Sequence, residues 1–365
     1  MSGPAQTPAA TPAAKKPPAK ATAADLRAFI AAVFGRAGMS PAHAGTVADA
    51  LVWANLRGVD THGVTRIPRY VELIDLGEMN PAPAITVSRD LPGSVLIDAD
   101  RGAGPVAMSF AAEKAAEKAR FAGIGMALVK STTHTAALGY YTQALARQGM
   151  AAIAISASWP NMAYHGARTA GVSTNPLSIA VPMGESEPLV LDMATGVVAM
   201  GKLVQAKKNG LPLEPGWALD RAGNPTTDAN EAHIPLPMGG PKGAGLSLMI
   251  ECLTSILVSN PLVSDWLEAL PISKKHRQNA MIIAIDLSKF TDPAAFGREV
   301  ARMAKDLAAL PRSDEASPIL MPGERGGRIA ERRSREGIPV PPAIMKELHA
   351  LAERLGVAMF QTSGS

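Results

Sequence analysis

The sequence has 365 residues, of which 47% are hydrophobic, and carries a formal net charge of +4 at pH 7. This length allows one large domain or two, and the hydrophobic share is ordinary for a globular core. No apolar run is long enough to cross a bilayer. The single cysteine, Cys252, excludes a disulfide framework and a zinc site of several thiolates within one chain. We therefore expect a cytoplasmic protein, since one cysteine is consistent with a reducing compartment.

The excess positive charge lies near the two ends of the chain. The basic residues there are Lys15, Lys16, Lys20, Arg325, Arg328, Arg332, Arg333 and Arg335. Aromatic residues that could stack on bases make up only 4% of the chain and do not alternate with these basic residues. A solvated tail and a charged helix face explain the charge better than a nucleic-acid site does. We expect no nucleic-acid and no membrane partner.

The first 22 residues are mainly Ala, Pro, Thr and Lys and show no apolar periodicity. This composition predicts a disordered leader, and it lacks the apolar block of a signal peptide. Helical spacing begins after it, with Leu26, Phe29 and Val33 on one face. Helices are predicted at residues 24–37, 41–57 and 67–76, the last ending at Gly77. Together they predict a small helical layer.

A strand, a glycine-bearing turn, a helix and a second strand come next. The strands are predicted at residues 94–98 and 124–130, and the helix at residues 106–122. The turn holds Gly102 and Gly104, so the order is that of a dinucleotide-binding fingerprint. Pro105 removes an N–H from this turn, and the second strand ends at Lys130 instead of an acid for the ribose. A Rossmann-type dehydrogenase that uses this turn is therefore an alternative, not the preferred fold.

The remaining two thirds of the chain alternate between strands and helices. Strands are predicted at residues 151–156, 178–181, 189–192 and 280–287. Helices are predicted at residues 246–258, 294–310, 329–336 and 342–355, with another ending near Gln148. Residues 212–230 are predicted as a loop, 260–278 as an irregular polar segment and 322–328 as a basic glycine loop. This alternation favours an α/β or α+β fold.

One short stretch, residues 60–66, carries most of the candidate chemistry. His62 can move a proton near neutral pH, and Arg66 can hold a carboxylate through two parallel hydrogen bonds. Thr61 adds a hydroxyl beside the imidazole. An enzyme that binds an oxo-acid or hydroxy-acid and protonates the oxygen next to its carboxylate needs these groups. The alternative is that Asp60 and Thr61 only cap a helix beside a half-buried histidine.

Two further positions could complete such a site. Asp192 ends an apolar strand, where a carboxylate can orient a histidine or cap the following helix. Lys242 lies in a glycine-rich segment, residues 239–245, that opens an apolar helix. Glycines allow the backbone to approach a ligand and the helix N-terminus favours an anion, so this segment predicts a phosphate site. The spacing is not that of a Walker P-loop.

Taken together, the motifs resemble the malate/L-lactate dehydrogenase family that does not use a Rossmann fold, a family that includes ureidoglycolate dehydrogenase, diketogulonate reductase, sulfolactate dehydrogenase and piperideine-2-carboxylate reductase. The resemblance rests on DTHGVTRIPRYVELIDLG, STTHTAALGYY, STNPLSIAVP, LVLDMATGVVAMGKL, LPLEPGWALDRAGNPTTD, GGPKGAGLSLMIECL, AIDLSKF and MPGERGGR with REGIPVP. It implies a homodimer that binds NAD or NADP. It also implies an α/β (α+β) fold with a non-Rossmann mixed-sheet cofactor domain, residues 82–328. A smaller helical domain, residues 23–81, would be joined by C-terminal helices, residues 329–360.

The resemblance also assigns roles to single residues. It implies that His62 is the proton donor or acceptor, that Thr61 and Asp192 orient it, and that Arg66 binds the substrate carboxylate. His134 matches a second histidine that serves as a base in some members and as a cofactor contact in others. The matched cofactor contacts are His134, Thr135, Ala136, Ala137, Leu138, Thr174, Asn175, Lys242, Glu324, Arg325 and Arg328. No metal site is implied, and no two histidines have ligand spacing on one helix.

The chain departs from the family pattern at four places. Thr61 stands where a serine is usual, which keeps the hydroxyl but adds a methyl group. Thr135 replaces the usual aromatic residue after His134, and Pro241 precedes Lys242 without an N–H to donate. Residues 260–276 match poorly. The first two changes touch the expected substrate pocket, so they leave the substrate's identity open.

We therefore expect hydride transfer between nicotinamide and the α-carbon of a 2-hydroxy or 2-oxo acid of the malate or lactate kind. Reduction of a cyclic imino acid such as piperideine-2-carboxylate is an alternative. A hydrolase that uses Thr61, His62 and Asp192 as a triad is another, although a nucleophile and base adjacent in sequence make that geometry awkward. The sequence leaves open which of His62 and His134 is the main acid/base.

Overall fold

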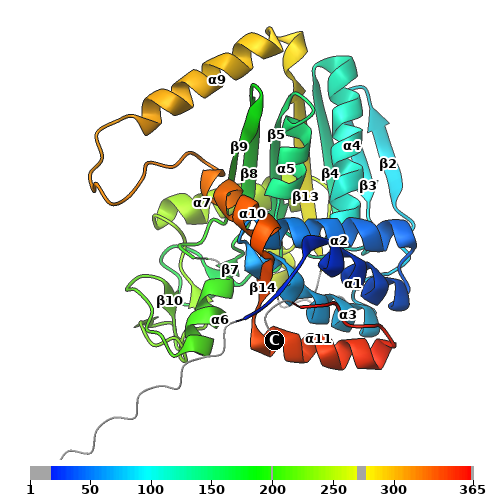
Figure 1. The fold of residues 1–365 in the computed structure, drawn as a ribbon, viewed down its shortest axis with the longest axis vertical. Coiled ribbons are helices and arrows are strands. Elements are labelled where there is room, and N and C mark those ends of the chain that lie inside the picture. The colour runs from blue at the N-terminus through cyan, green and yellow to red at the C-terminus, as the bar shows by residue number, and fades with distance from the viewer. Residues whose placement is uncertain (1–17, 199, 269–276, 363–365) are drawn as a thin grey trace, which may run out of the picture.

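A seven-stranded mixed sheet forms the centre of the protein (Figure 1). The computed structural model describes residues 18–198, 200–268 and 277–362. In spatial order the strands are β2 (Thr86–Leu91), β3 (Ser94–Asp98), β4 (Ile124–Thr132), β13 (Gln278–Asp286), β5 (Met150–Ala157), β8 (Leu177–Met183) and β9 (Ser186–Met193). Within the described residues, β3 and β4 are its one parallel pair of neighbours. The expected non-Rossmann mixed sheet is thus confirmed, and the Rossmann alternative built on Gly102 and Gly104 is wrong.

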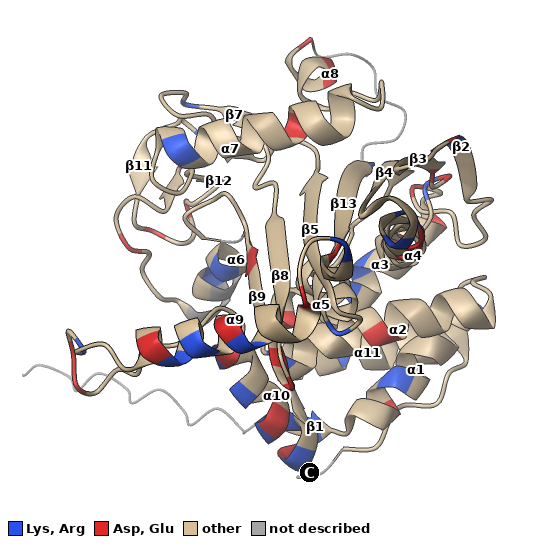
Figure 2. Cartoon of the chain, turned by 90° about the horizontal axis from the view of Figure 1, so that it is seen from above, with Lys and Arg blue, Asp and Glu red and all other residues tan. Residues whose placement is uncertain are grey.

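Helices cover both faces of this sheet (Figure 2). One face carries α4 (Gly104–Ala122) and α5 (Gly139–Ala146), and the other carries α7 (Pro241–Glu251), a π turn (Cys252–Ile256) and α8 (Val263–Leu267). Helix α4 packs very closely because its inward residues are alanines, such as Ala111 and Ala115. A Cβ at Gly125 of β4 would lie 1.9 Å from the Ala115 carbonyl oxygen. Small residues on both partners therefore set the distance between helix and sheet.

A helical layer lies at one end of the sheet. It contains α1 (Ala23–Arg36), α2 (Pro41–Leu56), α3 (Ile67–Asp75), α10 (Glu324–Glu336) and α11 (Pro342–Leu355). The predicted stripe Leu26, Phe29 and Val33 is buried there, against Leu348 of α11 and neighbouring side chains. Strand β1 (Ala19–Ala21) pairs with β14 (Ile338–Val340) and ties the two ends of the chain together. The division into two domains at residues 81 and 328 stays a prediction.

Several remaining elements are short. The short strands are β6 (Met162–Ala163), β7 (Ala170–Val172), β10 (Ala218–Leu219), β11 (Pro225–Thr226) and β12 (Ile234–Pro235), and the 3-10 turns are Asp60–His62, Val64–Arg66 and Leu287–Lys289. Two longer helices are α6 (Met200–Asn209) and α9 (Pro293–Ala308). Strands β10, β11 and β12 lie within or next to the predicted loop, residues 212–230, and form a small separate sheet.

The structure corrects three local predictions. Residues 1–17 of the predicted leader lie outside the described residues, but Ala19–Ala21 is ordered as β1 because it has a partner strand. The predicted basic glycine loop is helical from Glu324 onward, where α10 begins after the left-handed Gly323. The predicted helix 246–258 changes to a π turn after Glu251, and this turn buries Ser255 against Asn279 of β13. Of the predicted irregular segment 260–278, Val263–Leu267 forms helix α8, Gln278 begins strand β13, and residues 269–276 lie outside the described residues.

Candidate active site

The stretch of residues 60–66 folds into two successive 3-10 turns, Asp60–His62 and Val64–Arg66. The buried side chain of Asn55 in α2 holds both turns. Its Oδ1 accepts from the Val64 N–H at 2.8 Å, and its Nδ2 donates to Asp60 Oδ1 at 2.7 Å. A Cβ at Gly63 would lie 2.1 Å from Asn55 Oδ1, so only glycine fits there. One buried amide therefore fixes the backbone that carries His62 and Arg66.

Neighbouring groups set the orientation of the His62 ring. Thr61 Oγ1 lies 2.9 Å from His62 Nδ1, and Arg66 Nε donates to the Thr61 carbonyl at 2.6 Å. The Thr61 methyl is accommodated because residue 201 is glycine: a Cβ on Gly201 of α6 would lie 2.3 Å from Thr61 Cγ2. The hydroxyl thus occupies Nδ1 and leaves Nε2 of His62 as the nitrogen available to a substrate.

His134 brings the second imidazole to the same place from the end of β4. Its ring centroid lies 5.2 Å from that of His62, and the two ring planes differ by 31°. His134 Nδ1 lies 2.7 Å from the Tyr70 hydroxyl and 3.3 Å from the Ala136 backbone nitrogen. The structure therefore brings together four of the predicted residues, Thr61, His62, Arg66 and His134, and adds Tyr70 of α3, which the sequence reading missed.

Burial keeps this cluster neutral except at Arg66. Burial, followed by the charge of Arg66, lowers the pKa of His62 from 6.5 to about 3. The same causes and the neighbouring His62 hold the pKa of His134 well below its ordinary value. Burial also lowers the pKa of Arg66, and no carboxylate of the described residues lies within 4 Å of its guanidinium. A half-buried guanidinium without an acidic partner is suited to bind an anion from outside the chain.

Asp192 occupies a different part of the site. It accepts a hydrogen bond from the Gly139 N–H at 2.8 Å, at the start of α5, and lies near Trp53. Burial raises the pKa of its carboxyl to about 6, against the opposing effects of the Gly139 hydrogen bond and the charge of Arg57. Within the described residues it makes no hydrogen bond to Thr61 or His62. It caps α5 instead of the following helix, and its predicted orienting role stays a prediction.

The N-terminus of α7 has the properties of an anion site. Gly239 and Gly240 both have positive φ and lead into the helix, which has no side-chain cap. Lys242 in the first turn is exposed and has no ion pair within the described part of the chain. The buried hydroxyl of Thr195 has no hydrogen-bond partner among the described residues, and its carbonyl lies beside Gly243. The first-turn N–H groups of Lys242, Gly243 and Ala244 are bonded to backbone carbonyls, so a phosphate group would be held here by the Lys242 ammonium and the Thr195 hydroxyl, with the helix dipole favouring its charge.

The other predicted cofactor contacts are distributed more widely. Thr135, Ala136, Ala137 and Leu138 are buried at the start of α5, so any contact they make would use their backbone. Asn175 is fully engaged inside the protein: it accepts from Ser158 N–H and donates to the Ser247 carbonyl. Thr174 is half-buried next to it. Glu324, Arg325 and Arg328 lie on α10, which Figure 2 places on the opposite side of the sheet from α7.

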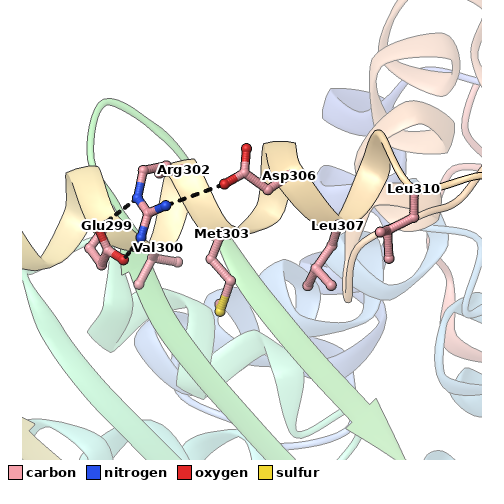
Figure 3. Close-up of a pocket in the computed structure, with 7 residues that line it drawn as sticks. All are labelled: Glu299, Val300, Arg302, Met303, Asp306, Leu307 and Leu310. Carbon is pink, nitrogen blue, oxygen red and sulfur yellow. Dashed lines mark hydrogen bonds and ion pairs between the residues drawn. The ribbon is translucent and has the colours of Figure 1, made fainter.

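A separate apolar groove runs along α9 and does not involve the predicted site (Figure 3). It is lined by Glu299, Val300, Arg302, Met303, Asp306, Leu307 and Leu310. The ion pairs of Arg302 with Glu299 and Asp306 border it on the solvent side. None of the residues predicted to bind substrate or cofactor contributes to this groove.

The sequence reading missed three residues that shape the site. Tyr70 follows Arg66 by one helical turn, and this spacing is the only sequence signal that places it on the same side as Arg66. Asn55 is the one amide in the apolar run of α2, which marks a buried polar group. Arg333 of α10 binds Asp60 through two hydrogen bonds of 2.6 and 3.0 Å. Nothing local in the sequence connects residues 60 and 333.

Comparisons with known proteins match nearly the whole chain. The model of the malate/L-lactate dehydrogenase family matches residues 21–349. A malate dehydrogenase of Pyrococcus horikoshii is 35% identical over 344 residues, covering 91% of this chain and 94% of that protein. Its solved structure superposes with a TM-score of 0.84 at 33% identity, covering 93% of this chain and 97% of that one.

Two other relatives have different substrates in their names. The NAD⁺-dependent ureidoglycolate dehydrogenase of Escherichia coli K12 is 32% identical over 316 residues, covering 86% of this chain and 90% of that protein. The pyrroline-2-carboxylate/piperideine-2-carboxylate reductase of Pseudomonas putida is 33% identical over 337 residues, covering 91% of this chain and 96% of that protein. With nearly the whole chain matched in sequence and in fold, this protein belongs to the malate/L-lactate dehydrogenase family and is an oxidoreductase.

Proposed function

We propose that the protein transfers a hydride between NAD or NADP and the α-carbon of a 2-hydroxy or 2-oxo acid. One observation carries this proposal. The half-buried guanidinium of Arg66 lies beside two neutral imidazoles and has no acidic partner among the described residues. A carboxylate next to a hydroxyl or carbonyl group would satisfy the guanidinium and present its oxygen to the imidazoles.

Each residue of the cluster has a defined part in the proposed reaction. Arg66 binds the carboxylate and fixes the position of the α-carbon. In the oxidation direction, His62 takes the hydroxyl proton at Nε2 while the hydride leaves the α-carbon. In the reduction direction the same nitrogen returns the proton to the oxygen. Thr61 holds the ring through Nδ1 at 2.9 Å, so the reacting nitrogen stays directed at the substrate.

The proposed cofactor would be held at two places in this chain. Lys242, at the start of α7, would bind phosphate groups, together with the Thr195 hydroxyl, which has no hydrogen-bond partner among the described residues. Backbone groups of residues 134–138 and Thr174 would contact the nicotinamide half. Bound nicotinamide supplies or accepts the hydride. The NAD⁺ dependence of the E. coli relative favours a pyridine nucleotide but does not distinguish NAD from NADP in this chain.

A cyclic imino acid such as piperideine-2-carboxylate is the second candidate substrate, supported by the P. putida relative. Such a compound also carries a carboxylate for Arg66, but the proton would go to nitrogen. The hydrolase alternative has less support: Asp192 makes no hydrogen bond to His62 within the described residues, so the triad of Thr61, His62 and Asp192 is not assembled.

The central test is the variant His62→Ala, assayed with purified full-length enzyme. NADH and NADPH oxidation are first screened with pyruvate, oxaloacetate, sulfopyruvate, ketopantoate-like acids and piperideine-2-carboxylate. With the best acid, we expect His62→Ala to lower kcat by about 10²–10⁴-fold, because a general acid/base has been removed. Nicotinamide binding, measured by fluorescence titration, should change little.

The matched control for this variant is His349→Ala. His349 is exposed on α11, where its ring nitrogen bonds the Met345 carbonyl, and it should be replaceable without loss of turnover. If His62→Ala retains the turnover of this control, His62 has been assigned the wrong role. If no acid supports nicotinamide oxidation in the wild type, the proposed reaction itself is wrong.

We also propose that the enzyme is a homodimer. Its support is an apolar stripe of exposed side chains on the outer side of α7 and the π turn, formed by Met249, Leu253, Ile256 and Leu257. These residues recur at helical spacing on one surface. Monomers rarely expose a continuous apolar patch of this kind without a partner for it.

A further inference from the structure

The hydrogen bonds around His134 restrict which of its nitrogens carries the proton. Nδ1 lies 3.3 Å from the backbone nitrogen of Ala136, whose N–H points at it. An amide nitrogen only donates, so Nδ1 must accept and must be unprotonated. In a neutral imidazole the proton then resides on Nε2. Ala136 is buried, and this is the contact that satisfies its N–H.

The contacts of Tyr70 alone do not show which tautomer His134 adopts. Its hydroxyl lies 2.7 Å from His134 Nδ1 and 3.2 Å from the His134 carbonyl oxygen. It could donate to Nδ1, or it could donate to the carbonyl and accept from a protonated Nδ1. In the second arrangement, the proton on Nδ1 would face the proton of the Ala136 N–H, and the two donors would repel each other. Tyr70 is therefore a donor to Nδ1, and both donors select the same tautomer.

The backbone around His134 is held in an unusual conformation that aims these donors. Ala136 has φ of 55° and Ser131 has φ of 56°, values that side-chain-bearing residues rarely adopt. Gly104 of α4 packs directly on this loop: a Cβ there would lie 2.2 Å from the His134 carbonyl oxygen. The Tyr141 hydroxyl donates to the Thr135 carbonyl at 2.7 Å. Neighbouring elements thus impose the turn that directs the Ala136 N–H to the ring.

We propose, resting on the proposed function, that His134 is a fixed hydrogen-bond donor to the substrate oxygen and that Tyr70 is its positioning residue. His134 then acts through Nε2–H and stabilises the negative charge that develops on that oxygen. It is not the base, because the lone pair of Nδ1 is already used by two donors and Nε2 carries a proton. His62, whose Nδ1 faces a hydroxyl that can donate or accept, carries the transferred proton.

The first test reads the tautomer directly and needs no turnover. Full-length protein labelled with ¹⁵N-histidine is examined by NMR for two-bond couplings between ring nitrogens and carbon-bound protons, with His134→Gln used to assign the signals. We expect His134 to show a protonated Nε2 and an unprotonated Nδ1. A protonated Nδ1 would overturn the proposal. This outcome is independent of whether the dehydrogenase assignment holds.

The second test separates a donor from a proton carrier. A glutamine amide can donate a hydrogen bond but cannot take up a proton. With the acid and nicotinamide found by the screen, His134→Gln should therefore lose about tenfold in kcat, whereas His62→Gln should lose about a thousandfold. The reverse order would assign the proton to His134 and overturn the proposal.

The third test addresses Tyr70 as a positioning residue. Tyr70→Phe keeps the ring and removes only the donor to Nδ1, so kcat should fall about tenfold while KM for nicotinamide stays within about twofold. The His134 Nδ1 signal should shift in the same variant. The matched control is Tyr140→Phe on α5, whose ring packs against Trp53 and Tyr141 and not against His134. Wild-type kcat in Tyr70→Phe, or an equal loss in Tyr140→Phe, would refute the positioning role.

Discussion

Single residues at the site show how burial determines charge. His62 and His134 are half-buried side chains next to the guanidinium of Arg66. Burial disfavours the imidazolium form, and the nearby positive charge adds to that effect. The free enzyme therefore holds both imidazoles neutral at physiological pH, which leaves His62 ready to accept a proton from a hydroxy acid. A bound carboxylate would weaken the effect of Arg66 and make the return of that proton easier.

The lowered pKa of His62 predicts how stability depends on pH. In the unfolded chain an ordinary histidine binds a proton below about pH 6.5, but in the fold His62 does so only near 3. Above that window both states are neutral and His62 contributes nothing. As pH falls from about 6.5 to about 5, the unfolded state alone gains the proton, so the free energy of unfolding decreases by at most about 2 kcal/mol. Urea unfolding at the two pH values measures this loss.

The variant His62→Gln supplies the comparison, since an amide does not titrate. Its loss of stability over the same pH interval should be smaller than that of the wild type. His349→Gln, an exposed site on α11, should retain the wild-type loss. Equal losses in all three proteins would contradict the assignment of this pH dependence to His62.

At the residue scale, the sequence could place candidate side chains together only where they are contiguous in the chain. His62 and Arg66 are four residues apart, so one motif reveals both, and the resemblance to a family pointed to His134. It could not show that Asn55, Tyr70 and Arg333 support them, because hydrogen bonds between distant segments leave no local pattern. For Asp192, the strand tip was recognised correctly, but the helix it caps, α5, comes earlier in the chain.

At the scale of elements, α10 acts as a clamp on the first 3-10 turn. Arg333 binds both oxygens of Asp60 at 2.6 and 3.0 Å and also contacts the Asn55 carbonyl. Its side chain is only 13% exposed. A partly buried, two-pronged contact of this kind gives both strength and direction. Because Thr61 and His62 directly follow Asp60, the clamp fixes the position of the reacting imidazole from outside the site.

Arg333→Lys tests this clamp while keeping the charge. Lysine cannot reproduce the planar fork, so the turn should loosen and kcat should fall about ten- to hundredfold. Steady-state kinetics and nicotinamide titration provide the measurement, with nicotinamide affinity expected to change less than kcat. Arg332→Lys, one residue away on the exposed side of α10, is the matched control. If Arg333→Lys lowers thermal stability but leaves kcat unchanged, the clamp serves the fold alone.

A helix or strand could be predicted only where its own residues mark its ends or show apolar periodicity. The last helix was predicted at its observed bounds, residues 342–355, since Pro at its first position and Gly356 after it mark both ends. Strand β2 was missed because all six of its residues are exposed and give no apolar alternation. The helical start of α10 was read as a loop because its two glycines lower helix propensity, an effect that packing against α2 overcomes.

At the scale of the whole molecule, the spatial order of the strands in the sheet could not be predicted from local sequence patterns. Strand β13 enters between β4 and β5, although more than one hundred residues separate it from either neighbour in the chain. Its apolar run, Met281 to Ile285, indicates a buried strand but not a partner. The helical layer could not be predicted from local patterns either, since it joins α1 and α2 to α10 and α11 from the other end of the chain.

Among the described helices, none combines the length and the apolar composition that a membrane span requires.

The surface distinguishes two candidate faces for association with a second copy. The groove on α9 is bordered by Glu299, Arg302 and Asp306, whereas α7 is almost without charge along its length (Figure 2, Figure 3). In a two-fold dimer the same patch meets itself, so charged residues near the axis would face their own copies. An uncharged stripe avoids this repulsion. The stripe of Met249, Leu253, Ile256 and Leu257 is therefore the better candidate for the dimer interface.

Leu253→Glu tests the proposed interface. Leu253 is 45% exposed in the single chain, so the substitution should leave the fold intact. In a dimer it would bury two carboxylates near the symmetry axis, which costs several kcal/mol and should shift the protein to monomers at micromolar concentration. Size-exclusion chromatography with light scattering measures the mass. Phe121→Glu, at a site 79% exposed on α4, should remain dimeric. A wild type that is monomeric, or a Leu253→Glu variant that keeps the dimer mass, would rule out this interface.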